Sequence, residues 1–332
     1  MAAGRPVGLA AVSVTAPLPA PPAGPSVAPV VRADGVVKYW GQTMALAGAT
    51  LEVGPGITGL LGANGSGKTT LLGLLLGLHA PDQGRLEVLG LDPTTAGPDV
   101  RASVGYAPEH HLLPPDVKAV DFVRHIGELH GLPRREATGR ASDMLWQVGL
   151  GEERVRPLGT FSTGQRQRVK LAQAIVHDPR LVLLDEPTEG LDPVQRDDML
   201  ALIRRIGTEF GIHVLLSSHV LDEVERIANN VIILNAGQLV AAGQLDDLQR
   251  GGSGVVVELA TGDGELEALA ADIRAVGCQV AVDGRRLVVH PGAAGVDPYD
   301  VVRDAVAARQ APLRRLSAQT RTLEDVFLGG EG

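Results

Sequence analysis

The sequence predicts an α/β fold with a mixed, largely parallel sheet, and two patterns lead to that prediction. Short apolar runs at residues 57–61, 181–184, 214–217 and 231–234 have the length of buried strands. Helical stretches such as 69–78, 165–176 and 194–206 lie between them. Strands that alternate with helices pair in parallel, and the helices cover the faces of the sheet. At 332 residues the chain has room for roughly two domains.

Composition limits the remaining possibilities. Apolar residues make up 44 % and charged residues 21 % of the chain, so a buried core is available and global disorder is excluded. A net charge of −9 argues against electrostatic wrapping of nucleic acid. The single Cys278 cannot form an intrachain disulfide, which fits a reducing compartment. The longest apolar run, residues 71–78, is far shorter than the ~18–20 residues that span a bilayer. We therefore expect a chain that is soluble or depends on a partner's membrane spans.

The chain divides into three predicted parts. Residues 1–30 form an Ala/Pro-rich tail, since residues 1–31 hold seven prolines, eight alanines and one charge, Arg5. This composition favours a disordered, partly polyproline segment over the alternative, a secretory signal. Residues 31–249 carry the alternating strands and helices. Residues 250–332 begin with a Gly-rich linker and read as a small α+β domain in the ferredoxin-like order βαββαβ, closed by a short helix at 323–327.

A Gly-rich turn between the strand 57–61 and the helix 69–78 has the pattern G-x-x-x-x-G-K-[ST]. A chain of this composition contains about 0.005 such matches by chance. Glycines let successive backbone N–H groups converge on phosphate oxygens, and the following helix adds the positive end of its dipole. Lys68 would reach the β- and γ-phosphates, and the Thr69 hydroxyl would bind Mg²⁺. The predicted ATP-binding loop is Gly62, Ala63, Asn64, Gly65, Ser66, Gly67, Lys68, Thr69 and Thr70.

The other lysines help to choose the nucleotide. The chain has only four lysines, and Lys38, Lys118 and Lys170 each follow a valine. A GTPase would normally carry an N-K-x-D element whose Asp reads guanine, and none of these lysines can belong to one. We therefore do not expect guanine specificity.

The strand 181–184 ends in two carboxylates, Asp185 and Glu186. Asp185 can meet Mg²⁺ directly or through water, and Glu186 is placed to polarise a water for attack on the γ-phosphate. An acidic pair at a strand end is common in proteins, so this run becomes informative only together with the phosphate loop.

Downstream segments carry a resemblance to a known family. One run resembles the signature of ATP-binding cassette (ABC) ATPases: Phe161-Ser162-Thr163-Gly164-Gln165-Arg166-Gln167-Arg168. Thr163 stands where the family most commonly has Gly. The D-loop of that family resembles Gly190-Leu191-Asp192-Pro193, which follows the acidic pair. His219 lies 33 residues after Glu186, where the family has its switch histidine. The agreement extends over residues 31–248 and implies an ABC cassette with a helical signature subdomain.

The resemblance implies roles for these residues. Two cassettes of this family pair head to tail, and the signature of each closes over the ATP that the other holds. The signature residues Ser162, Thr163, Gly164 and Gln165 would then contact the opposite subunit's ATP through side-chain and helix N-terminal donors. Asp192 would couple the two sites.

The catalytic set implied by the resemblance is Lys68, Glu186 and His219, where His219 would hydrogen-bond the γ-phosphate or the attacking water. The other eight histidines, including His110 and His111, form no ligand-like pattern and are expected to be surface or packing residues.

Two further site residues follow from alignment with the family. Trp40, 22 residues before Gly62, aligns with the aromatic side chain that stacks on adenine, and the adjacent Tyr39 is the alternative. Glu109 stands where the family commonly has Gln. Either residue offers an oxygen to Mg²⁺ or its water, so the implied metal set is Thr69, Asp185 and Glu109, and the implied cofactors are ATP and Mg²⁺.

The resemblance implies the ATP-hydrolysing subunit of an ABC transporter, peripheral on the cytoplasmic side of the cell membrane. Its partners would be separately encoded multi-span membrane subunits and a second cassette, in a homodimer or a heterodimer, without nucleic acid. The Pro108-Glu109 pair and the tail from Thr322 to Leu328 resemble the drug and antibiotic exporter branch, which favours export.

Two other classes of function fit the sequence less well than transport. Soluble ABC ATPases that act on ribosomes usually join two cassettes, and those that act on DNA usually carry a long coiled-coil insertion. This chain has one cassette, no long heptad run and a negative charge. A small-molecule kinase would explain the phosphate loop but neither the signature nor His219.

Overall fold

The computed structural model describes residues 28–110, 113–250, 254–260, 263–292, 297–319 and 322–324. The predicted tail therefore lies outside the described residues up to residue 27. Val30 is buried, donates its N–H to the Val53 carbonyl at 2.8 Å and accepts from the Leu89 N–H at 2.8 Å. The folded chain thus includes Val30, one residue before the predicted boundary.

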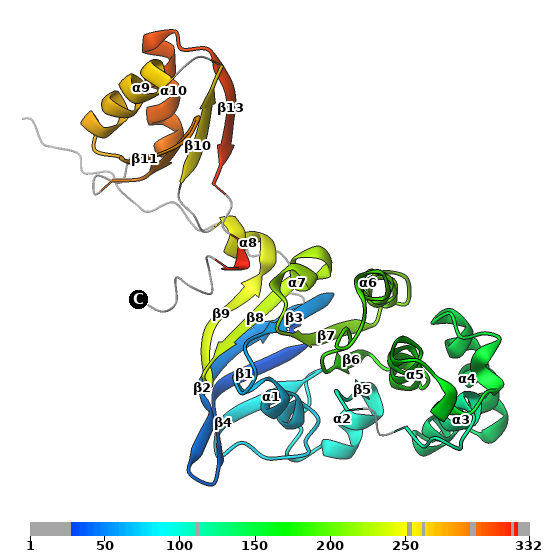
Figure 1. The fold of residues 1–332 in the computed structure, drawn as a ribbon. Coiled ribbons are helices and arrows are strands. Elements are labelled where there is room, and N and C mark those ends of the chain that lie inside the picture. The colour runs from blue at the N-terminus through cyan, green and yellow to red at the C-terminus, as the bar shows by residue number, and fades with distance from the viewer. Residues whose placement is uncertain are drawn as a thin grey trace, which may run out of the picture.

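Six strands form the central sheet, in the order β5-β6-β7-β3-β8-β9 (Figure 1). The first five in this order pair in parallel, and β9 runs antiparallel to β8 at the edge. Every residue of β3 and β6 is buried, which explains why these strands are uninterrupted apolar runs in the sequence. The bounds are β3 Ile57–Leu61, β5 Val104–Ala107, β6 Leu181–Leu184, β7 His213–Ser218, β8 Asn230–Asn235 and β9 Gln238–Gln244. The predicted mixed, largely parallel sheet is confirmed.

A second, antiparallel sheet lies over the phosphate-loop helix α1 (Lys68–Leu75) and has the strand order β2-β1-β4. No bounds were predicted for the strands of this sheet. The leucines of α1 pack against both sheets in one buried cluster, so α1 is apolar around most of its circumference. The helix ends at Leu75, three residues before the predicted end at residue 78. Gly77, with a φ of 64°, follows the helix end. The strands are β1 Val31–Trp40, β2 Thr43–Val53 and β4 Gln83–Val88.

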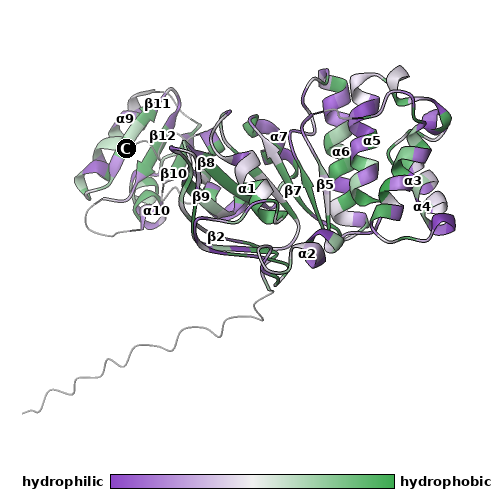
Figure 2. Cartoon of the chain, turned by 90° about the horizontal axis from the view of Figure 1, so that it is seen from below, coloured by the Kyte–Doolittle hydropathy of each residue, from purple (hydrophilic) through white to green (hydrophobic). Residues whose placement is uncertain are grey.

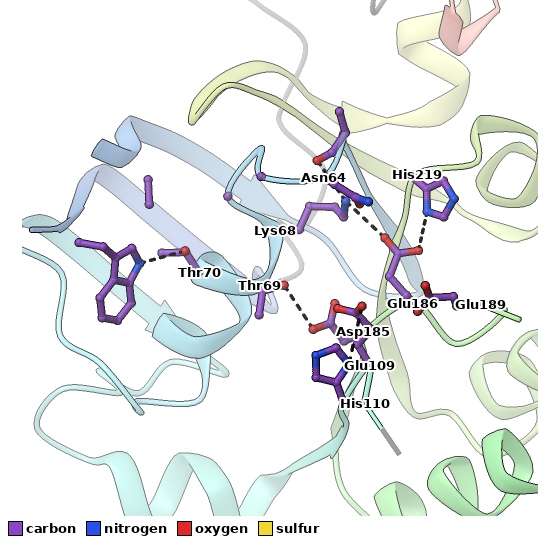
Figure 3. A pocket seen from close by; sticks show the side chains of 15 residues that line it. Asn64, Lys68, Thr69, Thr70, Glu109, His110, Asp185, Glu186, Glu189 and His219 are labelled. Carbon is purple, nitrogen blue, oxygen red and sulfur yellow. Dashed lines mark hydrogen bonds and ion pairs between the residues drawn. The ribbon is translucent and has the colours of Figure 1, made fainter. Parts of the chain in front are cut away.

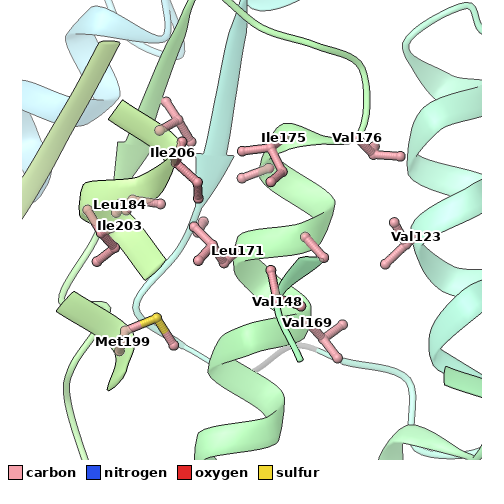
Figure 4. Close-up of a cluster of buried hydrophobic side chains, with 14 of the residues drawn as sticks. Val123, Val148, Val169, Leu171, Ile175, Val176, Leu184, Met199, Ile203 and Ile206 are labelled. Atoms are coloured by element: carbon pink, nitrogen blue, oxygen red, sulfur yellow. The ribbon is translucent and has the colours of Figure 1, made fainter. Parts of the chain in front are cut away.

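The helices of the cassette divide into a helical subdomain and helices beside the central sheet (Figure 1). Figure 2 shows hydrophobic and hydrophilic residues on different faces of α3, α5 and α6. Their apolar faces meet β6 in one core cluster, part of which Figure 4 shows. This packing fixes the signature helix α5 against the strand that carries the acidic pair. The bounds are α2 Gly97–Ser103, α3 Ala119–Leu129, α4 Arg134–Gln147, η1 Glu153–Val155, η2 Leu158–Thr160, α5 Thr163–Ile175, α6 Pro193–Glu209, α7 Leu221–Ile227 and α8 Leu245–Arg250.

The C-terminal part has the predicted βαββαβ order and its own apolar core. Its antiparallel sheet has the order β11-β12-β10-β13. No helix among the described residues is both long and apolar enough to cross a membrane. The bounds are β10 Val255–Leu259, α9 Asp263–Ala275, β11 Gln279–Asp283, β12 Arg286–His290, α10 Pro298–Arg309 and β13 Leu313–Ala318.

The last described residues return from the C-terminal domain to the cassette, beside α8 in Figure 1. Leu323 is fully buried in a cassette cluster with Leu61 and Val224, and its N–H donates to Glu225 Oε1 at 2.7 Å. Residues 325–327 of the predicted helix 323–327 lie outside the described residues. Residues 251–253 of the predicted linker also lie outside them.

Candidate functional site

The phosphate loop occupies the turn between β3 and α1, at the carboxyl end of the parallel strand. Gly67 has a φ of +107°, and a Cβ there would lie 2.5 Å from the Ala45 carbonyl oxygen, so only glycine fits. Lys68 begins α1, and its Nζ donates to the Gly62 carbonyl at 2.7 Å. Side chain and helix N-terminus therefore both direct positive charge to the same turn.

The acidic pair lies at the carboxyl end of β6, opposite the phosphate loop. Asp185 is 2 % exposed, and its Oδ1 accepts from Ser217 Oγ at 2.7 Å. Thr69 Oγ1 lies 3.5 Å from Asp185 Oδ2. Burial raises the pKa of Asp185, the Ser217 hydrogen bond opposes that shift, and the charges of Glu109 and Glu186 add to it.

Glu186 lies between Lys68 of the phosphate loop and His219 and contacts both (Figure 3). Its Oε1 lies 3.3 Å from Lys68 Nζ, and its Oε2 lies 2.9 Å from His219 Nδ1. The Glu186 backbone has a φ of +46°, unusual for a residue with a side chain, and its N–H donates to Ser217 Oγ at 2.9 Å. The other two predicted catalytic side chains, Lys68 and His219, therefore both contact Glu186.

Trp40 is the last residue of β1 and lines the same cleft as the phosphate loop and the acidic pair. Its Nε1 donates to Thr70 Oγ1 at 3.2 Å, and the His79 ring meets the indole edge-on, with centroids 4.7 Å apart. The indole stays 45 % exposed. Tyr39 binds Asp82 through its backbone N–H instead, and Trp40 is the neighbour that lines the cleft.

These residues surround one cleft of about 520 Å³. Sequence reasoning missed three of the lining residues, Ala45, His110 and Glu189. His110 is exposed, as expected for a surface residue, and it also lines the cleft, with its Nδ1 3.8 Å from Glu109 Oε1. Its position beside Glu109 in the sequence was the available signal; His111 lies outside the described residues. The predicted residues that line the cleft are Trp40, Ala63, Asn64, Gly65, Gly67, Lys68, Thr69, Thr70, Glu109, Asp185, Glu186 and His219.

The signature and D-loop residues begin two helices outside this lining. Ser162 caps α5 in a reciprocal pair with Gln165: Gln165 N–H donates to Ser162 Oγ at 3.3 Å, and Ser162 N–H donates to Gln165 Oε1 at 3.1 Å. Asp192 caps α6 and accepts from the Gln195 N–H at 2.9 Å. A Cβ on Gly164 would lie 2.9 Å from Gln195 Oε1, so the starts of the two helices pack closely.

Two buried charged residues that sequence reasoning left unassigned support the site. Lys170, on α5, donates to the Glu109 carbonyl at 2.9 Å; burial lowers its pKa to about 8, against the opposing charges of Asp185, Glu189 and Glu109. Glu223, on α7, is 2 % exposed and accepts from both Thr188 and Ser218. No local sequence signal marks Glu223, because its partners lie on other segments.

Comparisons with known proteins agree with this arrangement. The family described as ABC transporter matches residues 46–189. The "Daunorubicin resistance ATP-binding protein DrrA3" of Streptomyces coeruleorubidus is 33 % identical over 90 % of this chain and 94 % of its own length. The "Linearmycin resistance ATP-binding protein LnrL" of Bacillus subtilis (strain 168) is 30 % identical over 91 % of this chain and 98 % of its own length.

Solved structures agree in fold. The cbiO1 structure from Clostridium perfringens, part of the ABC transporter complex cbiONQ, has a TM-score of 0.61 at 25 % identity, over 65 % of this chain and 89 % of that one. The dimeric cassette MJ0796 has a TM-score of 0.58 at 23 % identity, over 65 % of this chain and 98 % of that one. This chain therefore belongs to the ABC transporter family and contains the family's ATP-binding cassette.

Proposed function

We propose that this chain hydrolyses MgATP as one of two paired cassettes and thereby drives export through separate membrane subunits. The observation that carries the proposal is the position of the Glu186 carboxylate between Lys68, at 3.3 Å, and His219, at 2.9 Å. A carboxylate held by a phosphate-loop lysine and a histidine is suited to accept a proton from a water that attacks the γ-phosphate.

The residues beside Glu186 fit a magnesium ion. Asp185 is buried close to other carboxylates, and a dication would relieve the resulting rise in its pKa. No group of three or more His, Cys, Asp or Glu side chains within the described ranges could hold a metal alone. Mg²⁺ suits such a site because it takes one or two carboxylates together with substrate phosphates. Thr69, Asp185 and Glu109 would hold the ion, which would neutralise charge on the β- and γ-phosphates.

The protein's own residues divide the work of hydrolysis. The loop N–H groups and Lys68 bind the β- and γ-phosphates, and Trp40 stacks on adenine. Glu186 takes the proton of the attacking water. His219 orients the Glu186 carboxylate through their contact and would hydrogen-bond the γ-phosphate. Ser162 and the N-terminus of α5 would act on ATP in the second cassette, which is consistent with their place outside this cleft.

Glu186→Gln tests the assignment of the base. Gln keeps the size of the side chain but cannot accept the proton, so we expect turnover to fall by about 10²–10⁴-fold with ATP binding retained. Glu87→Gln, the same exchange at an exposed position on β4, is the control. ATP binding is measured by calorimetry and phosphate release by a coupled assay. Turnover in Glu186→Gln equal to wild type would remove Glu186 as the base.

Lys68→Ala tests nucleotide binding independently. The variant removes the cation that contacts both the loop carbonyl and Glu186, so ATP affinity should fall by at least about tenfold. Unchanged affinity would contradict the phosphate-loop assignment.

The export role draws on the relatives whose names describe daunorubicin and linearmycin resistance. We place the chain at the cytoplasmic face of the membrane, bound to multi-span subunits. Co-purification from detergent-solubilised membranes should recover such a subunit, and vesicles holding both should move an apolar drug only with ATP and intact Glu186. Recovery of ribosomes without a membrane subunit would favour the soluble alternative instead.

A further inference from the structure

The signature helix α5 carries two buried polar side chains one turn apart. Gln167 is 3 % exposed and Lys170 is 2 % exposed. Residues three apart lie on the same face of a helix. Burying an amide or an ammonium group is costly unless it is hydrogen-bonded, so the partners of these two side chains carry information about their role.

Each side chain donates to a backbone carbonyl of the ATP cleft rather than to its own helix. Gln167 Nε2 lies 3.2 Å from the Glu189 oxygen, and Lys170 Nζ lies 2.9 Å from the Glu109 oxygen. Glu109 follows β5 and Glu189 follows the acidic pair, and both side chains line the cleft (Figure 3). One face of the signature helix is therefore bonded to two loops of its own cassette's cleft.

The two donors differ in charge. The Lys170 ammonium feels the carboxylates of Asp185, Glu189 and Glu109, whereas the Gln167 amide is neutral. An apolar side chain would pack at position 170 with a smaller desolvation cost, so what lysine adds is a donor to Glu109 and a positive charge behind the acidic side of the cleft.

We propose that Lys170 is a positioning residue that holds the Glu109 segment so that the Glu109 carboxylate faces the metal side of the cleft. Through this bond the helix that begins with the signature is joined to the metal side of its own ATP site. The inference rests on the proposed function, in which Glu109 offers an oxygen to Mg²⁺ or its water. It assigns Lys170 a role in the same cassette, separate from the contacts of Ser162 and Gly164 with the opposite ATP.

A double-mutant cycle tests whether Lys170 acts through Glu109. Lys170→Met, measured per folded protein in saturating Mg²⁺, should lower kcat by about tenfold while KM for ATP changes by less than about twofold. Glu109→Ala should lower kcat similarly. In the Glu109→Ala background Lys170→Met should cause no further loss, because the carboxylate that Lys170 positions is gone.

Hydrogen exchange without nucleotide gives a second readout. Lys170→Met should speed exchange in the segment 104–110 and leave the segment after Glu186 at the wild-type rate. Gln167→Met removes the equally buried donor to the Glu189 carbonyl on the same helix face. It should speed exchange in the segment after Glu186 and leave the segment 104–110 at the wild-type rate. If Lys170→Met does not fold, Lys170→Gln, which is neutral and too short to reach, enters the same cycle with the same expectations.

The outcomes separate the inference from the proposed function. Equal kcat in Lys170→Met and wild type, or an equal loss in the Glu109→Ala background, overturns the role of Lys170 and leaves the ATPase assignment intact. A Glu109→Ala variant with wild-type kcat removes Glu109 from the proposed metal set and overturns the inference with it.

Discussion

Glu223 allows a direct test of how the segments around Glu186 are held together. Its carboxylate is 2 % exposed and accepts from Thr188 Oγ1 at 2.7 Å and from Ser218 Oγ at 2.9 Å. Arg196 Nε lies 3.1 Å from Glu223 Oε1. Thr188 follows the acidic pair, Ser218 directly precedes His219, and Arg196 lies four residues after Asp192. One side chain on α7 therefore contacts three segments of the cassette.

The size of the effect follows from the burial of each partner. Glu223→Ala leaves the Thr188 hydroxyl buried without this acceptor, whereas Ser218 keeps a contact with the backbone of Val220. The Arg196 side chain is 38 % exposed although its Nε is buried, so its loss of Glu223 adds less than that of a fully buried partner. We expect Glu223→Ala to lower the free energy of unfolding by about 3 kcal/mol, and Glu223→Gln, which keeps an acceptor, by about half as much.

Urea unfolding followed by fluorescence measures this loss in the cassette alone. The chain's two tryptophans, Trp40 and Trp146, both belong to the cassette. A loss of about 3 kcal/mol moves the midpoint by roughly 1 M urea. Asp222→Ala, an exposed carboxylate on the same helix, should cost less than about 0.5 kcal/mol. A Glu223→Ala midpoint no lower than that of Asp222→Ala would show that Glu223 does not stabilise the cassette through these contacts.

Two further predictions concern adenine and pH. Trp40→Ala should weaken ATP binding about tenfold by removing a stacking surface, whereas Trp40→Phe and Tyr39→Ala should change it by less than about threefold in calorimetry; equal losses for Trp40→Ala and Tyr39→Ala would contradict the choice of Trp40. Burial lowers the pKa of His177 to about 4, and the ring stacks on His130. Because the unfolded chain takes up this proton near pH 6.5, the contribution of His177 to stability is complete above that pH and declines as the pH falls toward 4. Allowing for its partial exposure, we expect the urea midpoints of wild type to report a loss of about 1 kcal/mol from pH 7 to pH 5, and His177→Gln to lack that part; an unchanged acid limb in the variant would exclude His177 as its source.

The sequence alone predicted the parts of the site that depend on continuous runs. The phosphate loop could be predicted because Gly67 has a positive φ that favours glycine, and the spacing of glycines in the sequence reveals that requirement. The strand before Asp185 could be read because it is buried on both faces and therefore apolar throughout. The family resemblance added His219 and Trp40, whose spacing in the chain reflects a shared fold.

Positions whose role depends on a distant partner could not be read in this way. Lys170 and Glu109 are 61 residues apart, and Glu223 and Thr188 are 35 residues apart. His110 is exposed, as predicted, but only the fold shows that the segment after β5 brings it to the lining of the cleft. A side chain's partners depend on which loops the sheet order brings to one edge.

The fold class, the Gly-rich loop and the acidic strand end could thus be predicted from local patterns, because each follows from backbone preference and from the burial of contiguous residues. The carbonyls that Lys170 and Gln167 reach, the partners of Glu223 and the packing of Leu323 became known only from the folded chain. A buried polar group must find its hydrogen-bond partner in space, and parallel strands with long crossovers bring together segments far apart in the chain.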